Sequence, residues 1–241
     1  MAEKINFSVL SQPDDSTCGP TCLQAVYQHF GLDIPLEQVI EEVQSLEGGG
    51  TVAVFLGLHA LRNGFDATIF TYNLQLFDPS WFHKKQVPLR DKITDQLSFK
   101  RDRKLKEVSK AYMEFLDNGG RIRFEDLTAS LIRRYLKLEI PVLTGLSSTY
   151  LYRCPREIVR NNELVFDDLA GEPTGHFIVI TGYEKAPNWV WIADPLSPNP
   201  ASPSQYYGVH INHLVCSIML GILTYDANLL VIEPRSGEKK K

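Results

Sequence analysis

One cysteine of this chain lies where a polar loop meets the start of a predicted helix. Cys18 follows the turn residues 13–16 and precedes Gly19 and Pro20; glycine allows close backbone approach, and proline is favoured in a first helical turn. The positive end of the helix dipole favours a thiolate over a thiol at that position. Gln12 lies six residues upstream, and its side-chain amide can donate to a developing oxyanion together with the backbone N–H of Cys18. The pattern indicates a cysteine nucleophile.

A histidine and an aspartate near the end of the chain have the spacing of partners for that cysteine. His176 opens an apolar, β-branched run that ends at Gly182, and a second apolar run, Trp189–Ala193, ends at Asp194. The two runs have the signature of an antiparallel hairpin, in which the start of one strand faces the end of the other. We therefore expect His176 and Asp194 to be neighbours, with His176 as the base and Asp194 as the group that orients it.

These residues together carry a resemblance to a known family. The motifs, in chain order, are Gln12 with Cys18-Gly19-Pro20-Thr21-Cys22-Leu23, Gly175-His176-Phe177-Ile178-Val179-Ile180-Thr181-Gly182-Tyr183, and Trp191-Ile192-Ala193-Asp194-Pro195. The chain resembles the papain-like double-glycine leader peptidases, which process bacteriocins and are often fused to transporters. The resemblance covers about residues 7–70 and 140–195 and includes no phosphate-binding loop, so we expect a stand-alone form.

The resemblance implies both a fold and a set of roles. The implied fold is papain-like α+β, with an N-terminal helical half that carries the nucleophile and an antiparallel sheet half that carries the histidine and aspartate. The implied catalytic residues are Cys18 as nucleophile, His176 as base, Asp194 as orienting residue and Gln12 as oxyanion donor. No metal or organic cofactor is implied.

The elements that must position these residues are visible in the hydrophobic periodicity. Helical spacing or β-branched runs predict helices over about 18–30, 36–45, 52–62, 104–116, 124–138 and 210–220, and strands over about 67–72, 140–146, 176–182, 189–193 and 229–232. Because helices dominate the first part and strands the last, the expected class is α+β. Residues 1–241 are expected to form a single domain. Residues 73–120 are a predicted insertion that could cap the site.

Composition narrows the class of protein further. The chain has 241 residues, of which 44% are hydrophobic, and a formal net charge of −4, so neither nucleic acid nor an anionic membrane is an expected partner. No segment approaches the length of an apolar membrane span, and the N-terminus lacks the apolar core of a signal peptide. We therefore expect a cytoplasmic protein whose four cysteines are free thiols.

The remaining candidate residues have structural interpretations. Cys22, Cys216 and His59 are expected in the core, and Cys154 is expected in a loop. A metal site at Cys18, Cys22 and His29 lacks further ligands at suitable spacing. Tyr206 and Tyr207 are expected to serve packing rather than substrate contact.

Three functions are compatible with the sequence. The first is a cysteine-dependent hydrolase that cleaves a peptide or small amide substrate through a thioester intermediate. The second is an acyltransferase or transpeptidase with the same residues, as in the papain-like phytochelatin synthases. The third is a non-catalytic module that binds a leader peptide. The sequence leaves the oligomeric state open.

Overall fold

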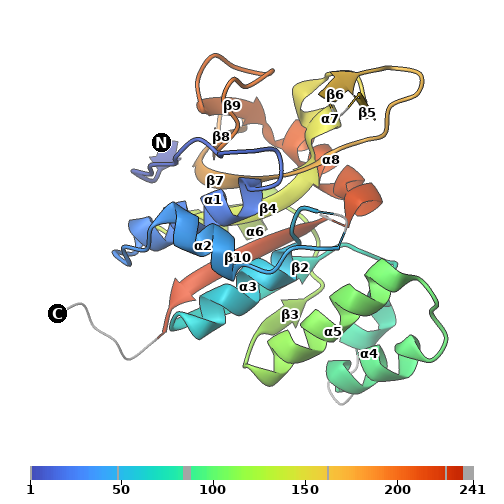
Figure 1. Cartoon of the computed structure of the whole chain (residues 1–241). Helices are drawn as coiled ribbons and strands as arrows, with labels where there is room; N and C mark the ends of the chain where they lie inside the picture. The colour runs from blue at the N-terminus through green and yellow to red at the C-terminus, as the bar shows by residue number, and fades with distance from the viewer. Residues whose placement is uncertain (1, 48, 84–87, 162, 226, 236–241) are drawn as a thin grey trace.

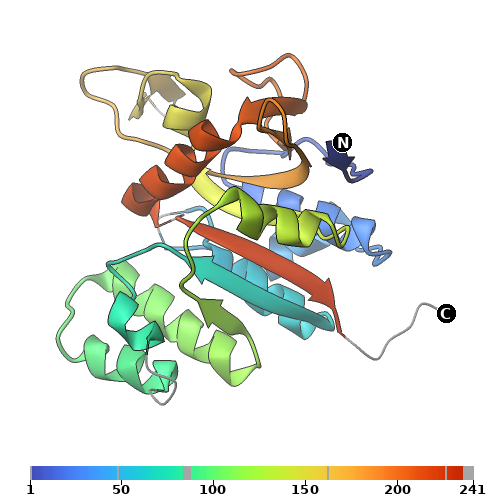
Figure 2. The ribbon, with the colours of Figure 1, turned by 180° about the vertical axis from the view of Figure 1, so that it is seen from behind.

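A mainly antiparallel sheet runs through the molecule, with helices on both of its faces (Figures 1 and 2). The computed structural model describes residues 2–47, 49–83, 88–161, 163–225 and 227–235. Along the sheet the strand order is β3-β2-β10-β4-β7-β8-β9, with β1 paired to β7. Of the strand pairs that the described residues form, only β2–β3 is parallel. Among the described residues, β5 and β6 form a separate two-stranded hairpin.

The strands are short at the edges of the sheet and longest at its centre. They are β1 (Ala2–Lys4), β2 (Phe65–Thr71), β3 (Arg121–Arg123), β4 (Val142–Ser147), β5 (Glu157–Arg160), β6 (Glu163–Phe166), β7 (Gly175–Glu184), β8 (Trp189–Ala193), β9 (Tyr206–His210) and β10 (Asn228–Pro234). The helices are α1 (Cys18–His29), α2 (Leu36–Glu42), α3 (Ala53–Arg62), α4 (Leu89–Leu97), α5 (Arg103–Asp117), α6 (Ala129–Leu136), α7 (Ser148–Tyr152) and α8 (Ile211–Leu220). Two 3-10 turns, η1 (Pro79–Phe82) and η2 (Gly221–Thr224), complete the description.

The central strands are buried on both faces because their side chains alternate between two hydrophobic cores. On β2, Ile69 belongs to the core under α1, α3 and α5, whereas Phe70 belongs to the core on the opposite face. The same alternation separates Val179 from Ile178 on β7. Continuous apolar runs in the sequence therefore become two-sided strands.

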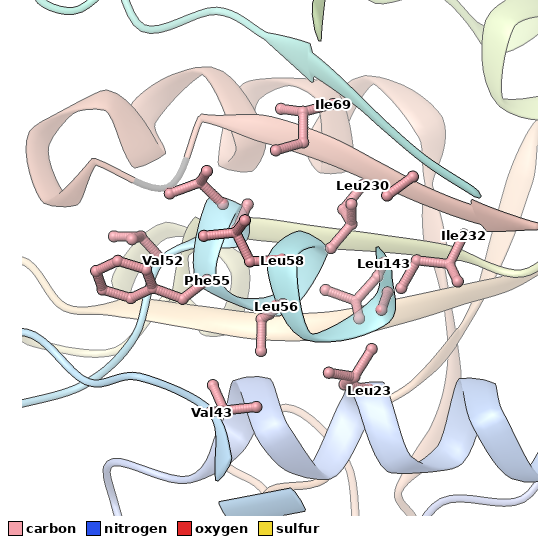
Figure 3. Close-up of a cluster of buried hydrophobic side chains, with 14 of the residues drawn as sticks. Leu23, Val43, Val52, Phe55, Leu56, Leu58, Ile69, Leu143, Leu230 and Ile232 are labelled. Atoms are coloured by element: carbon pink, nitrogen blue, oxygen red, sulfur yellow. The ribbon is translucent and has the colours of Figure 1, made fainter. Parts of the chain in front are cut away.

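Helices α1 and α3 pack side by side against the sheet in the first core, with α1 in contact with β7 and α3 in contact with β2 and β10. Figure 3 shows Leu56 and Leu58 of α3 in the same cluster as Leu23 of α1 and the strand residues Leu143 and Leu230. Because α1 is held against the sheet through this packing, the position of its first residue is set by buried apolar contacts.

The helix predicted over 124–138 is shorter in the structure. Residues 121–123 pair with β2 as β3, and the helix α6 starts only at Ala129. Thr128 sets this start, because its side chain accepts a hydrogen bond from the backbone N–H of Leu131 at 3.2 Å, as an N-cap residue does. Helix α4 was not predicted, since only Ile93 of its residues is buried and the apolar stripe is too sparse to recognise.

The described part of the segment 73–120, residues 73–83 and 88–120, packs at the β3 side of the sheet. Helix α5 contacts α3 and β3, and Phe115 of α5 is fully buried in the first core. Strands β7 and β8 lie toward the other edge of the strand order, and Figure 1 shows α4 and α5 well away from them. That residues 73–120 are an insertion in a single domain, and that this insertion could cap the site, both stay predictions. The described helices include none with the length and hydropathy of a membrane span.

Candidate active site

Cys18 is the first residue of α1 and is 9% exposed. The preceding loop is ordered by Asp14, whose side chain accepts a hydrogen bond from the backbone N–H of Ser16 at 2.8 Å. Gly19 lets the first helical turn approach its neighbours, because an added Cβ would lie 2.5 Å from the Thr51 side chain and 3.3 Å from that of Phe177. Helix α1 therefore begins directly beside the start of β7.

The thiol of Cys22 lies one turn further along α1 and faces the same strand. Its Sγ donates to the carbonyl oxygen of Phe177 at 3.3 Å, and the side chain is fully buried. Burial raises the pKa of this thiol well above its usual range, and the charges of Cys18 and Asp194 raise it further. The expected core role of Cys22 is confirmed.

His176 and Asp194 are in direct contact, as the hairpin spacing predicts. Strands β7 and β8 pair antiparallel, with Val179 opposite Ala193, so the residue after β8 lies beside the start of β7. His176 Nε2 lies 2.8 Å from Asp194 Oδ1, and the two residues are 6% and 0% exposed. Cys18 lies close enough for its charge to act on the imidazole together with that of Asp194.

The charges of these side chains support one another. Burial lowers the pKa of His176, but the negative charges of Asp194 and Cys18 outweigh burial and raise that pKa above its usual value. Burial conversely raises the pKa of Asp194, and His176 and the hydrogen-bond donors around the carboxylate hold it below its usual value. The pair is therefore an imidazolium and a carboxylate near neutral pH.

Asp194 has further hydrogen-bond partners that sequence reasoning missed. Its Oδ1 also accepts the backbone N–H of Leu196 at 3.0 Å. Its Oδ2 accepts the hydroxyl of Tyr152 at 2.8 Å, the hydroxyl of Tyr207 at 2.7 Å and the side-chain amide of Asn199 at 2.9 Å. A buried carboxylate needs such donors, but nothing in the sequence around residues 152, 199 and 207 marks them as its partners.

Gln12 lies beside the residue that follows Asp194. Its backbone N–H donates to the carbonyl oxygen of Pro195 at 2.9 Å, and its Nε2 donates to the carbonyl oxygen of Asp14 at 2.8 Å. Its buried Oε1 has no hydrogen-bond partner among the described residues. Since Nε2 carries two N–H groups and one of them donates to Asp14, the other remains for another acceptor, and the role of Gln12 at the oxyanion stays a prediction.

The sequence model of the Peptidase_C39 like family matches residues 4–212, most of the chain. The chain belongs to the Peptidase_C39 like family. A search among curated proteins finds no match. Among solved structures, a C39-like peptidase from Bacillus anthracis is 14% identical, with a TM-score of 0.52 over 97% of this chain and 98% of the other. This likeness confirms the papain-like α+β fold of the C39-like chain.

Two further structures similar to this C39-like chain fall below that TM-score. A double glycine motif protease of an AMS/PCAT transporter, in complex with the leader peptide, is 14% identical with a TM-score of 0.44 over 96% of this chain and 94% of the other. Xylellain, a cysteine protease from Xylella fastidiosa, is 15% identical with a TM-score of 0.43 over 97% and 85%.

The other candidate residues of the C39-like chain lie outside this site. His59 is buried, as predicted, between the Tyr27 hydroxyl at 2.7 Å and Glu42 at 3.0 Å. Cys216 is exposed rather than in the core, because α8 buries Leu214 and Ile218 and residue 216 lies on its other face. Among the residues that the structure describes, no group of three or more His, Cys, Asp or Glu is arranged to hold a metal ion.

Proposed function

We propose that this C39-like protein is a cysteine-dependent hydrolase that cleaves a peptide or small amide bond. The observation that carries the proposal is the buried His176–Asp194 pair beside the first turn of α1. His176 Nε2 lies 2.8 Å from Asp194 Oδ1. Cys18, the first residue of α1, lies close enough for its charge to act on His176. A nucleophile, a base and an orienting carboxylate in that order are the arrangement that nucleophilic catalysis requires.

In the first half of the reaction, the Cys18 thiolate attacks the substrate carbonyl carbon and forms an S–C bond. The developing oxyanion accepts hydrogen bonds from the backbone N–H of Cys18, which has no partner within a helix at that position, and from the amide of Gln12. His176 gives its proton to the leaving nitrogen as the C–N bond breaks. The amine leaves, and Cys18 carries the acyl group as a thioester.

In the second half, His176 takes a proton from a water molecule, which attacks the thioester carbonyl carbon. The S–C bond breaks, the carboxylic acid product leaves, and the proton on His176 restores the imidazolium beside the thiolate. Asp194 keeps Nε2 protonated throughout, so Nδ1 faces the reacting atoms in both halves.

The test compares Cys18→Ala with a matched cysteine variant outside the site. Cys154 is a partly buried free thiol between α7 and β5, so Cys154→Ala is the control. We expect Cys18→Ala to abolish cleavage of a peptide library, read by mass spectrometry, while its melting temperature and the activity of Cys154→Ala stay at the wild-type level. Retained cleavage by Cys18→Ala would end the proposal.

Two added measurements distinguish the proposal from its alternatives. Products that carry the mass of an added amine would identify acyl transfer, whereas free carboxyl products identify hydrolysis. Iodoacetamide at mildly acidic pH should label Cys18 faster than Cys154. Equal rates of labelling would favour the non-catalytic binding module.

A further inference from the structure

The carboxylate of Asp194 has more donors than an orienting residue needs. One oxygen, Oδ1, serves His176 and the backbone of Leu196, while the other, Oδ2, is occupied entirely by Tyr152, Asn199 and Tyr207. These last three residues come from α7, from the loop after β8 and from β9, so three separate segments converge on one oxygen.

We propose that Tyr152 and Tyr207 are positioning residues, which hold Asp194 ionised and correctly turned so that His176 stays aligned with Cys18. The inference rests on the proposed function, because it concerns the same site. Neither tyrosine is assigned contact with the substrate, since both hydroxyls are used on Asp194.

Saturation of the carboxylate opposes its protonation. A carboxylate offers about four lone-pair positions, and five donors already occupy the two oxygens of Asp194. The Leu196 and Asn199 donors are amide N–H groups, which cannot turn into acceptors for a new carboxyl proton, and His176 can do so only by giving up its own proton. Protonation of Asp194 must therefore displace at least one donor or reverse a tyrosine hydroxyl.

Tyr152 also limits the movement of the histidine ring. The ring centroids of Tyr152 and His176 lie 6.0 Å apart at an interplanar angle of 56°. Tyr152 thus contacts both members of the ion pair, through its ring on one side and its hydroxyl on the other. Tyr207 is 9% exposed and reaches Oδ2 from the neighbouring strand β9, so the carboxylate cannot turn without breaking this bond.

The groups that titrate around Asp194 come from every element packed against it. They are His176 on β7, Tyr152 on α7, Tyr207 on β9, and Cys18 and Cys22 on α1. Burial and the charge of Asp194 hold the pKa of both tyrosines far above their usual value. Both tyrosines therefore remain neutral donors over the whole pH range of a rate measurement.

The experiment measures the pH dependence of Cys18 alkylation in Tyr152→Phe, Tyr207→Phe and the double variant. Iodoacetamide is the probe, and mass spectrometry with fragmentation locates the label at Cys18. Each variant keeps the ring and removes one donor to a charged oxygen, so Asp194 should take up a proton at higher pH. We expect the acid limb of the alkylation profile to move up by about one pH unit in each single variant and further in the double variant.

The matched control is Tyr183→Phe. Tyr183 is 4% exposed and its hydroxyl donates to Asn188 Oδ1 at 3.0 Å near the far end of β7, so this variant loses a buried tyrosine hydrogen bond that does not involve Asp194. Its acid limb should coincide with that of the wild type. If Tyr207→Phe does not fold, Tyr152→Phe carries the test, since that side chain is only partly buried.

An acid limb that stays at the wild-type pH in folded variants, with only a lower melting temperature, would overturn the positioning role. Peptide cleavage by the Tyr152 and Tyr207 variants is measured separately, and we expect a lower kcat with an unchanged KM. The two proposals can fail independently. Cleavage retained in Cys18→Ala removes the proposed function but leaves the alkylation result intact, whereas an unmoved acid limb removes only the positioning role.

Discussion

The substitution Asp194→Asn removes the charge behind His176 while keeping the size of the side chain. The carboxamide oxygen can still face His176, but the amide nitrogen then meets the side-chain amide of Asn199, a donor, at the other end. Without the negative charge, burial dominates and the pKa of His176 falls. The basic limb of the pH–rate profile, which reports loss of the His176 proton, should therefore move to lower pH.

The size of this shift follows from the geometry. Two unit charges at the observed separation of 2.8 Å attract by about 6 kcal/mol at an effective dielectric constant of about 20. If a quarter of that attraction, about 1.5 kcal/mol, survives the desolvation of the pair, the basic limb moves by about one pH unit. We expect a shift of at least this size.

The same substitution should change how stability depends on pH. The pKa of Asp194 is lowered in the folded protein, so its contribution is present above the ordinary value of about 3.9 and is lost as the pH falls through the folded value. The pKa of His176 is raised, so its contribution is complete below about 6.5 and is lost as the pH rises through the folded value. Asp194→Asn should remove the stability maximum between these two limits.

The assay is the rate of peptide cleavage from acidic to alkaline pH, with unfolding in urea at matched pH values. The control is Asp167→Asn, because the Asp167 side chain, like that of Asp194, accepts backbone hydrogen bonds, here from Leu169 and Ala170, but lies in the turn after β6. A basic limb that does not move in Asp194→Asn would refute the idea that the charge of Asp194 maintains the imidazolium.

Three further predictions concern the packing around the site. Gly19→Ala places a Cβ 2.5 Å from the Thr51 Cγ2 and should lower the free energy of unfolding, measured in urea, by about 1–3 kcal/mol. The double variant Gly19→Ala/Thr51→Ser should recover part of this loss, and no recovery would mean that Thr51 is not the obstacle. Cys22→Ala should keep peptide cleavage but lower the free energy of unfolding by about 1–2 kcal/mol, because a buried side chain is lost. Cys216→Ala, at an exposed position, should change that free energy by no more than about 0.5 kcal/mol. Equal losses in the two variants would contradict the burial argument. Burial lowers the pKa of His59, so the unfolded state binds its proton first, and the free energy of unfolding should fall as the pH drops through about 6.5. His59→Gln should make the free energy of unfolding depend less on pH in this range, and an unchanged dependence would assign it to other groups.

Local sequence was sufficient for the elements that carry the proposed nucleophile and base. Helix α1 begins at Cys18 as predicted, because the loop-to-helix boundary is encoded by neighbouring residues. The hairpin of β7 and β8 also follows from two apolar runs and the turn between them, and its antiparallel pairing brings Asp194 to His176. Such contacts within a hairpin depend on short stretches of chain and are therefore predictable.

Other features depend on partners that are distant in the sequence. The exposed position of Cys216 follows from which face of α8 packs on the sheet, and the apolar stretch around it does not reveal that face. The β3 strand became visible only through its pairing with β2, since three residues with two arginines have no strand signature. The placement of α5 likewise follows from the packing of Phe115 under α3.

The sequence by itself determined the α+β class, the start of α1 at Cys18 and the pairing of His176 with Asp194. Each of these depends on periodicity, turn residues or hairpin spacing, which act over a few residues. Only the tertiary structure decided that the start of α1 lies beside β7 and the His176–Asp194 pair, and that Tyr152, Asn199 and Tyr207 converge on Asp194. A buried carboxylate must collect donors from whatever segments the fold brings within hydrogen-bonding distance, and that selection is made by the packing of the whole sheet.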